Sequence, residues 1–385
     1  MKVLIRAPLL TVSGYGVHSR QVFRWLESKR EFDVRAQVLN WGDTTWMINS
    51  ELESGLIGRI MSKSGDLDSD FDISFQIQLP DEWDNSLAKI NVGISAFVET
   101  DRCNPEWLGC VNKMDAIIVP SNHIKRVIEN TGQVNTKVYV IPEWFFDEVS
   151  HDNENLPLEI DTKFNFLLVG QVTGNTPESD RKNIFNTIAW FCEAFKDDPD
   201  VGLILKTNKG RGTMIDRSWT KDTVKQLLSQ VRKGPYPKIH MLHGNLTPDE
   251  IVSLYKRDDV KCLLSLTRGE GFGLPLLEAS ACGLPVIATN WSAHLDFLGM
   301  GKFVPINYKM CEIPPERIDN RIFFSGMRWA DPLESDFKKK VVKLRNKYDM
   351  PQAWAKELSV KVRSEFSSHS IKKKYDKFLQ DLLDE

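Results

Sequence analysis

The chain has 385 residues and a net charge of −3, from 50 Lys and Arg against 53 Asp and Glu, with 41% hydrophobic and 27% charged side chains. Because single cores seldom exceed about 250 to 300 residues, this length favours two domains. The balanced charge argues against a dedicated nucleic-acid surface, and the ordinary composition argues against long disorder or a disulfide scaffold.

Metal-binding and membrane-spanning signals are weak in this sequence. The six cysteines form no C-x-x-C pair and have no histidine at metal spacing, which argues against zinc and against a redox dithiol. The apolar start at residues 1–5 is interrupted by Arg6 and Pro8, and nowhere do 18 apolar residues run together. We therefore expect neither a signal peptide nor a transmembrane segment, and a cytoplasmic location, with peripheral attachment to a membrane as an alternative.

The first half of the chain alternates predicted strands and helices. A buried strand is predicted over residues 2–8, and a turn at residues 13–16 leads into a helix over residues 17–29. Short β-branched segments predict further strands over residues 34–40, 73–79, 90–97, 116–119 and 137–141. Ser121 can cap a helix that runs to about residue 130.

The second half repeats this alternation after a polar, aperiodic segment at residues 151–163, which we interpret as a linker. Strands are predicted over residues 164–170, 201–206, 239–243, 260–266 and 285–289. Helices are predicted over residues 183–196, 221–232, 248–257 and 274–282. Such alternation predicts an α/β protein with two parallel sheets, each covered by helices on both faces.

The most informative segment is residues 268–287, RGEGFGLPLLEASACGLPVI. It follows a predicted buried strand, so its glycines lie at the carboxyl end of a parallel sheet, where open α/β folds bind ligands. The following helix would present free amides and its positive end to a phosphate or sugar oxygen. The carboxylates of Glu270 and Glu278 are expected to converge there. A plain structural turn is the alternative, and spacing alone favours neither.

Seven residues separate Glu270 from Glu278, and the segment resembles the E-x7-E motif of retaining, nucleotide-sugar-dependent glycosyltransferases of family 4, within glycosyl transferases group 1. Residues 114–142, 179–183 and 289–298 are also similar to segments of that family. The resemblance implies a GT-B fold, in which two Rossmann-like domains with parallel sheets face a central cleft. It also implies an acceptor domain over residues 1–150, a donor domain over 151–355, and a helix over 356–385 that crosses back to the first domain.

The resemblance assigns roles to individual residues. Lys182 would bind the donor diphosphate with help from Arg181, Glu270 would face the transferred sugar, and these three are the catalytic candidates. Glu278 would hold the ribose hydroxyls. The other donor-binding candidates offer backbone amides or a cation: Gly271, Phe272, Gly273, Leu274, Gly14, Gly16 and Lys206. The candidates on the acceptor side are Glu99, His18 and His123.

Several positions depart from the family or leave an alternative open. Gln171 stands where many members have arginine, and residues 96–99 contain no histidine where many members have one. Residues 13–19 are a near miss to the dinucleotide fingerprint G-x-G-x-x-G, so a plain turn is the alternative to a ligand loop there. The acidic residues 65–72 are interpreted as a solvated loop. The lysine runs at 338–340 and 372–374 are interpreted as charged outer faces, with membrane attraction as the alternative.

The sequence thus predicts a retaining glycosyltransferase that moves a hexosyl or pentosyl group from a nucleotide diphosphate sugar to an acceptor hydroxyl. Front-face attack with stabilisation of the leaving phosphate, without metal or other cofactor, is expected from the resemblance. The donor stays open between UDP and GDP sugars, and the acceptor among a glycan, lipid, protein, small molecule or modified nucleobase. Alternatives are a noncatalytic sugar-binding or phosphorylase-like protein of this fold, and a nicotinamide oxidoreductase.

Overall fold

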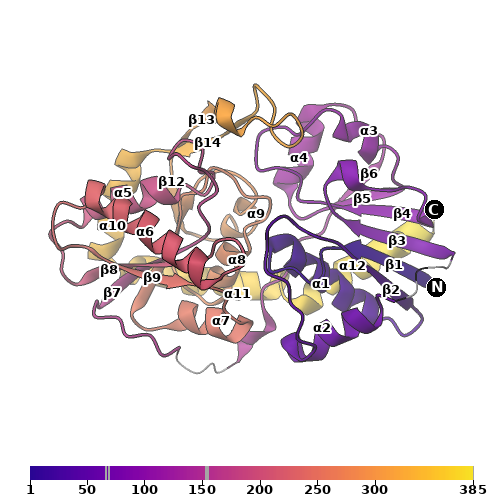
Figure 1. Cartoon of the computed structure of the whole chain (residues 1–385), viewed down its shortest axis with the longest axis horizontal. Coiled ribbons are helices and arrows are strands. Elements are labelled where there is room, and N and C mark those ends of the chain that lie inside the picture. Colours follow the sequence, from indigo (N-terminus) through magenta and orange to yellow (C-terminus); the bar gives the residue numbers. More distant parts are fainter. Residues whose placement is uncertain (66, 68–69, 152–155, 385) are drawn as a thin grey trace. The chain divides into compact units, whose positions relative to one another are not determined.

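The computed structural model describes residues 1–65, 67, 70–151 and 156–384 (Figure 1). The chain divides into two compact units. Unit 1 comprises Met1–Trp144 and His369–Glu385, and unit 2 comprises Phe145–Ser368. The sequence analysis drew boundaries at 150 and 355, whereas the structure assigns residues 145–150 and 356–368 to unit 2.

Unit 1 is built on a six-stranded parallel sheet in the order β2-β1-β3-β4-β5-β6. Its strands are β1 Lys2–Ala7, β2 Asp33–Val38, β3 Phe71–Ile77, β4 Ala88–Ile94, β5 Ala116–Val119 and β6 Lys137–Val140. Most side chains of β1, β3 and β5 are buried, as expected of parallel strands covered on both faces. The carboxyl ends of all six strands therefore meet at one edge of the sheet.

The helices of unit 1 are α1 Gly14–Glu27, α2 Leu52–Ser62, α3 Trp107–Val111, α4 Asn122–Thr131 and α12 Ser368–Leu383. As predicted, Ser121 caps α4, because its side chain accepts a hydrogen bond from the Ile124 amide. Short 3₁₀ turns lie at Pro80–Glu82 and, in unit 2, at Asp147–Ser150 and Pro315–Arg317. Figure 1 shows α12, the last helix of the chain, beside the strands of unit 1.

Unit 2 contains a second six-stranded parallel sheet, in the order β12-β11-β10-β7-β8-β9. Its strands are β7 Phe164–Val169, β8 Val201–Thr207, β9 Lys238–His243, β10 Val260–Ser265, β11 Val286–Thr289 and β12 Val304–Ile306. Its helices are α5 Ile184–Ala194, α6 Met214–Val231, α7 Pro248–Lys256, α8 Leu274–Ala281, α9 Leu295–Leu298, α10 Glu334–Asn346 and α11 Asp349–Glu365. Two parallel α/β units are what the alternation of strands and helices predicted.

Some elements differ from the prediction. An antiparallel pair, β13 Tyr308–Glu312 with β14 Arg328–Pro332, was not expected. The single helix expected over residues 356–385 is instead the end of α11 followed by α12. The chain leaves α11 at Phe366, whose buried ring packs 5.9 Å from the ring of Phe297 and so anchors this end in unit 2.

Two other expectations meet the structure only in part. The solvated loop expected over residues 65–72 includes positions 66, 68 and 69, and the linker expected over 151–163 includes positions 152–155, all outside the described residues. β3 takes up the end of the first segment, since it begins at Phe71. Among the described helices, none combines the length and apolar character needed to cross a bilayer.

Candidate functional site

The site begins at the turn from β10 into α8. Gly273, the residue before α8, adopts a left-handed conformation with φ of 99°. A Cβ at this position would also lie 3.2 Å from Leu276 Cδ1 and 3.3 Å from His294 Cβ, so glycine is favoured for both backbone and packing reasons. Glycine has no side chain to cap the helix. Pro275 has no N–H, and the amides of Leu276 and Leu277 donate to the Gly273 carbonyl, so the Leu274 amide is the group at this helix start that can meet a ligand.

Two cations and one carboxylate lie beside this turn. Lys182 Nζ is 2.6 Å from Glu270 Oε1, and Arg181 Nη1 is 3.9 Å from Glu270 Oε2. Arg181 also donates a hydrogen bond of 2.6 Å to the Gly269 carbonyl. Burial alone would raise the pKa of Glu270, but the charges of Lys182 and Arg181 outweigh it and hold that pKa below its usual value. The three predicted catalytic candidates therefore form one cluster.

Arg268, which the sequence analysis did not single out, connects the two halves of this cluster. Its guanidinium donates to the carbonyls of Pro177 and Asp180 and pairs with Asp331 at 2.8 Å. Its amide donates to the carbonyl of Arg181. Arg268 thus holds the segment that carries the cations against the glycine-rich loop. Its position directly before the E-x7-E segment was the available signal.

The Asp180 carboxylate fixes the entry to α5, just before the two cations. One oxygen accepts hydrogen bonds from the amide and hydroxyl of Thr173, and the other accepts from the Ile184 amide at 2.6 Å. Satisfying a free amide at a helix start is a favoured role for aspartate. Its place four residues before Ile184, in the segment 179–183 that resembles the family, was a usable sequence signal.

A chain of hydrogen bonds supports the backbone of Glu270 from the segment after β11. The Glu270 amide donates to Ser292 Oγ at 3.0 Å, and Ser292 Oγ lies 3.3 Å from His294 Nδ1. His294 Nε2 lies 2.7 Å from the Thr289 carbonyl, an acceptor, so this nitrogen carries the proton. Burial lowers the pKa of His294, which keeps the ring neutral, with Nδ1 free to accept from Ser292.

Glu278 lies on α8 in different surroundings. Tyr255 of α7 donates a hydrogen bond of 3.3 Å to Glu278 Oε2, and the carboxyl is buried. Burial raises its pKa to about 8, so it is mostly protonated at neutral pH. The two carboxyls that were expected to converge therefore have different partners and opposite pKa shifts.

Lys206 and Phe272 contribute to the same edge of the sheet in different ways. Lys206 is the penultimate residue of β8, beside β7, and its Nζ donates a hydrogen bond of 2.6 Å to the Gly244 carbonyl beyond β9. Burial lowers the pKa of Lys206 to about 8. The Phe272 ring is buried against Phe297, so only its backbone is available to a donor. Gln171, in place of the family arginine, is exposed after β7.

In unit 1, the predicted glycine loop joins β1 to α1. Ser13 caps α1 by accepting from the Gly16 amide at 2.9 Å. A Cβ on Gly16 would lie 2.1 Å from the Thr11 carbonyl oxygen, whereas a Cβ on Gly14 meets nothing within 4 Å. Tyr15 stacks on Trp41 with ring centroids 3.9 Å apart. Packing therefore explains why residue 16 is a glycine, whereas packing places no such demand on residue 14.

The structure places the acceptor-side candidates at separate points of unit 1. Glu99 is half-buried in the loop after β4. His18 is buried, with Nε2 3.2 Å from the Tyr375 hydroxyl of α12, and burial lowers its pKa to about 4. His123 is buried on α4. The ring of His18 thus packs against the C-terminal helix, and its acceptor role stays a prediction.

Within the described residues, no three His, Cys, Asp or Glu side chains are grouped so that they could hold a metal ion.

Comparison with known proteins agrees with this geometry. Residues 198–310 match the family model of glycosyl transferases group 1. The predicted family resemblance is confirmed over this segment. It contains Glu270, Glu278 and Lys206, whereas Arg181 and Lys182 precede it. The serotype-specific mannosyltransferase WbdA of Escherichia coli is 31% identical over 124 residues, which are 32% of this chain and 13% of that protein. The chain thus spans about an eighth of the length of this curated relative.

Several solved structures share the fold across most or all of the chain. Sucrose-phosphate synthase from Thermosynechococcus elongatus superposes with a TM-score of 0.66 at 12% identity, covering 100% of this chain and 99% of that one. HepE from Anabaena, in complex with UDP and glucose, superposes with a TM-score of 0.61 at 12% identity, covering 99% of this chain and 100% of that one. The pneumococcal O-GlcNAc transferase GtfA, in complex with UDP and GlcNAc, superposes with a TM-score of 0.55 at 14% identity, covering 90% of this chain and 64% of that one. The GT-B fold predicted from the sequence is confirmed.

Proposed function

We propose that this chain is a retaining glycosyltransferase and that unit 2 binds a nucleotide diphosphate sugar. The observation that carries the proposal is the cluster of Lys182, Arg181 and Glu270 beside the uncapped start of α8. The match of residues 198–310 to glycosyl transferases group 1 supports the same assignment, as do the UDP complexes of HepE and GtfA.

The two cations and the helix start suit a diphosphate. Lys182 and Arg181 both lie within 4 Å of Glu270, so they place two cationic side chains at one point beside the helix start. In the proposed reaction the bond between the sugar and the diphosphate breaks, and the diphosphate leaves with the electron pair. Cations and amides already aimed at that developing charge lower the barrier, by about 3 to 4 kcal/mol for one donor in comparable sites.

Glu278 suits a sugar diol. Its carboxyl is mostly protonated at neutral pH, so one oxygen can donate and the other can accept a hydrogen bond. Ribose hydroxyls both donate and accept, so a buried carboxyl in either protonation state can bind them. We propose that Glu278 holds the ribose and that Glu270, kept ionised by Lys182, faces the transferred sugar.

The remaining steps are assigned to the substrates. The acceptor hydroxyl attacks the anomeric carbon on the face that the diphosphate leaves, and an oxygen of the leaving phosphate takes the hydroxyl proton. This route retains configuration, and no metal is assigned to it. We propose the amides around Gly14 in unit 1 as a ligand-binding turn, because a side chain there would meet open space.

Donor binding is tested by a thermal-shift panel of UDP and GDP sugars. A ligand that binds only the folded protein raises the melting temperature as its concentration exceeds its Kd. At least one nucleotide sugar is expected to raise it, and NAD is not. If no nucleotide or nucleotide sugar raises the melting temperature, or if NAD alone does, the assignment fails.

The role of Lys182 is tested by Lys182→Ala. Loss of a charged hydrogen bond weakens donor affinity about 10- to 100-fold, and loss of one stabilising group at the leaving charge lowers turnover about 100- to 1,000-fold. Lys163→Ala is the matched control, because Lys163 is an exposed lysine of the same unit. Equal affinity and turnover in both variants would remove Lys182 from the site. Donor binding by the unaltered chain without hydrolysis or transfer would identify a noncatalytic sugar-binding protein.

A further inference from the structure

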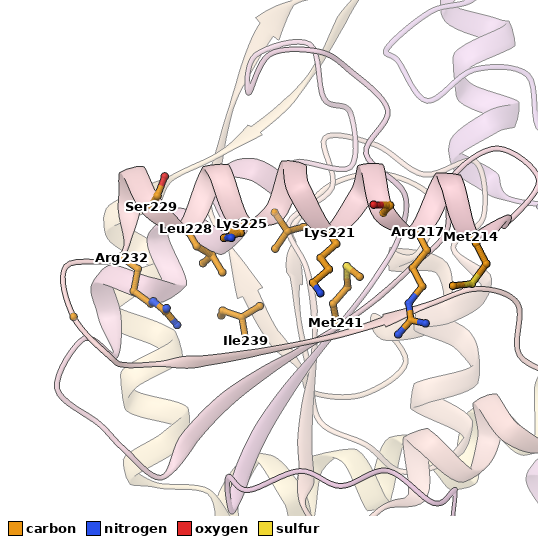
Figure 2. Close-up of a pocket in the computed structure, with 12 residues that line it drawn as sticks. Met214, Arg217, Lys221, Lys225, Leu228, Ser229, Arg232, Ile239 and Met241 are labelled. Carbon is orange, nitrogen blue, oxygen red and sulfur yellow. The ribbon is translucent and has the colours of Figure 1, made fainter.

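A basic groove lies between α6 and β9 in unit 2, away from the residues assigned to the donor (Figure 2). β9 is the last strand in the order of this sheet, so the groove runs along a sheet edge. Its volume is about 820 Å³. Apart from Thr220, the residues of α6 are exposed or half-buried, and the half-buried side chains that pack against the core of unit 2 are Val224, Leu227, Leu228 and Val231.

Cations line one side of the groove. Arg217, Lys221 and Lys225 recur every four residues, so they lie on one face of α6 at intervals of about 6 Å. Arg232 continues the row beyond the helix end, and Figure 2 shows Arg217, Lys221 and Arg232 directed toward β9. The groove lining has four Lys and Arg and no Asp or Glu. Residues 206–238 as a whole, which include the donor candidate Lys206, contain nine Lys and Arg against two Asp, a net charge of +7 in a chain whose net charge is −3.

The acidic groups near the groove do not cancel this charge. Asp216 accepts hydrogen bonds from the amide and hydroxyl of Thr213 at the start of α6. Asp161 pairs with Lys238 at the start of β9. Asp222 follows Lys221 on the neighbouring side of the helix. The row of Arg217, Lys221 and Lys225 therefore keeps its positive character.

Apolar side chains accompany the cations. Ile239 and Met241 of β9 and Leu228 of α6 lie in the groove (Figure 2). At the start of α6 the exposed fractions are 74% for Met214 and 82% for Ile215. Exposed large apolar side chains next to a cationic row are costly in water unless a partner covers them, because burial of apolar area is favourable by about 25 cal/mol per Å².

We propose that α6 and the basic groove dock on an anionic phospholipid membrane. The phosphates of the lipid head groups would meet Arg217, Lys221, Lys225 and Arg232, and Met214 and Ile215 would enter the boundary between head groups and acyl chains. Interfacial helices combine a cationic face with apolar side chains that insert about 5 to 10 Å. Trp219, which is 49% exposed on the same helix, is a residue type that favours this boundary.

This occupant fits better than a nucleic acid. The phosphates of a nucleic acid would pair with the cations, but the exposed methionine and isoleucine would have no partner. Nucleic acids bind proteins through their phosphates and through base edges or base stacking on aromatic rings. The charge of the whole chain concealed this surface, because the +7 of residues 206–238 is offset elsewhere in the sequence. The surface shares no residue with Lys182, Arg181, Glu270 or Glu278, so the inference stands apart from the proposed donor site.

The test is co-sedimentation of the full chain with phosphatidylcholine vesicles, with and without phosphatidylglycerol. Binding is expected only to the anionic vesicles and is expected to weaken as salt rises. Lys221→Glu with Lys225→Glu should lower the partition coefficient at least about 30-fold, since each basic residue near an anionic surface contributes about fivefold. Ile215→Ser should lower it about fivefold or more, because the inserted apolar area is lost.

The matched control is Lys339→Glu with Lys343→Glu on α10. These two exposed lysines belong to the same unit and have the same spacing and charge change, so their replacement should leave vesicle binding unaltered. The donor thermal shift of every variant reports whether it is folded. Equal binding to neutral vesicles, equal loss in both double variants, or an Ile215→Ser variant that binds as the unaltered chain does would each overturn the proposal. Displacement from vesicles by single-stranded DNA at equal phosphate would favour a nucleic-acid partner and overturn it too.

Discussion

Glu270 and Glu278 show how surroundings alone separate two identical side chains. Both are at least nine-tenths buried, with exposed fractions of 7% and 5%, so desolvation opposes ionisation in each. Lys182 and Arg181 reverse that effect at Glu270 and lower its pKa. Glu278 is hydrogen-bonded to the Tyr255 hydroxyl, no cation contributes to its pKa shift, and burial raises its pKa to about 8. One site thus holds an ionised and a mostly neutral carboxyl at neutral pH.

Replacement of Glu278 by glutamine tests this difference. Because the folded pKa lies above the ordinary 4.5, the folded state holds a proton that the unfolded state has lost, and the free energy of unfolding falls as pH rises from about 4.5 to 8. The Glu278→Gln variant lacks that titration. Relative to the variant, the unaltered chain should lose about 4 kcal/mol between pH 5 and pH 9. Chemical denaturation at the two pH values measures it, and parallel curves would contradict the raised pKa.

In the turn from β1 into α1, two glycines likewise differ because of their surroundings. The sequence pattern treats Gly14 and Gly16 alike, as two glycines of a ligand loop. In the structure only Gly16 is closed to a side chain, because the Thr11 carbonyl lies where a Cβ would be. The amide of Gly16 also completes the Ser13 cap. Packing therefore requires one glycine and leaves the other to function.

Alanine at each position tests the distinction. Gly16→Ala should lower the free energy of unfolding by about 3 kcal/mol, because Thr11 or the start of α1 must move. Gly14→Ala should change it by less than about 0.5 kcal/mol, because its Cβ meets open space and alanine favours a helix. Denaturation midpoints measure both. A stable Gly16→Ala variant would contradict the close approach, and altered transfer kinetics in a stable Gly14→Ala variant would support a ligand role for that turn.

The start of α6 lies seven residues before its predicted position. α6 was predicted from residue 221, yet it starts at Met214, after Thr213 and Asp216 form a reciprocal capping box. That pattern, T-x-x-D, stands in the sequence and was a usable signal. The β13–β14 pair gave no comparable signal, because its strands meet only through antiparallel contacts between segments about 20 residues apart.

At the scale of the whole chain, the last helix completes the first unit. Tyr375 of α12 stacks on Trp25 with ring centroids 4.8 Å apart, and its hydroxyl lies 3.2 Å from His18 Nε2. The Trp25 indole also donates to Asp376 at 2.7 Å. Unit 1 therefore depends on residues more than 340 positions away from α1, whereas unit 2 is continuous from Phe145 to Ser368.

The substitution Tyr375→Ala should therefore destabilise unit 1 and leave the stability of unit 2 unaltered. Loss of this buried ring should destabilise unit 1 by about 3 to 5 kcal/mol, while Tyr375→Phe should cost only about 1 kcal/mol, because it removes a single hydrogen bond. Hydrogen exchange followed by mass spectrometry should accelerate in residues 1–144 and 369–384 and stay unaltered in unit 2. Equal acceleration in both units would contradict the assignment of α12 to unit 1.

Local patterns in the sequence determined the alternation of strands and helices, the Ser121 cap and the E-x7-E loop, because periodicity, capping and glycine at a strand end act within a few residues. The tertiary structure alone decided which ionisable groups meet. Lys182 and Glu270 are 88 positions apart, and only the parallel neighbours β7 and β10 bring them within 2.6 Å. Folding likewise buried His18, which looked available for chemistry, and gathered the cations of α6 along a sheet edge. The ionisation and exposure of a side chain depend on its neighbours in three dimensions, and the spacing of residues along the sequence does not specify those neighbours.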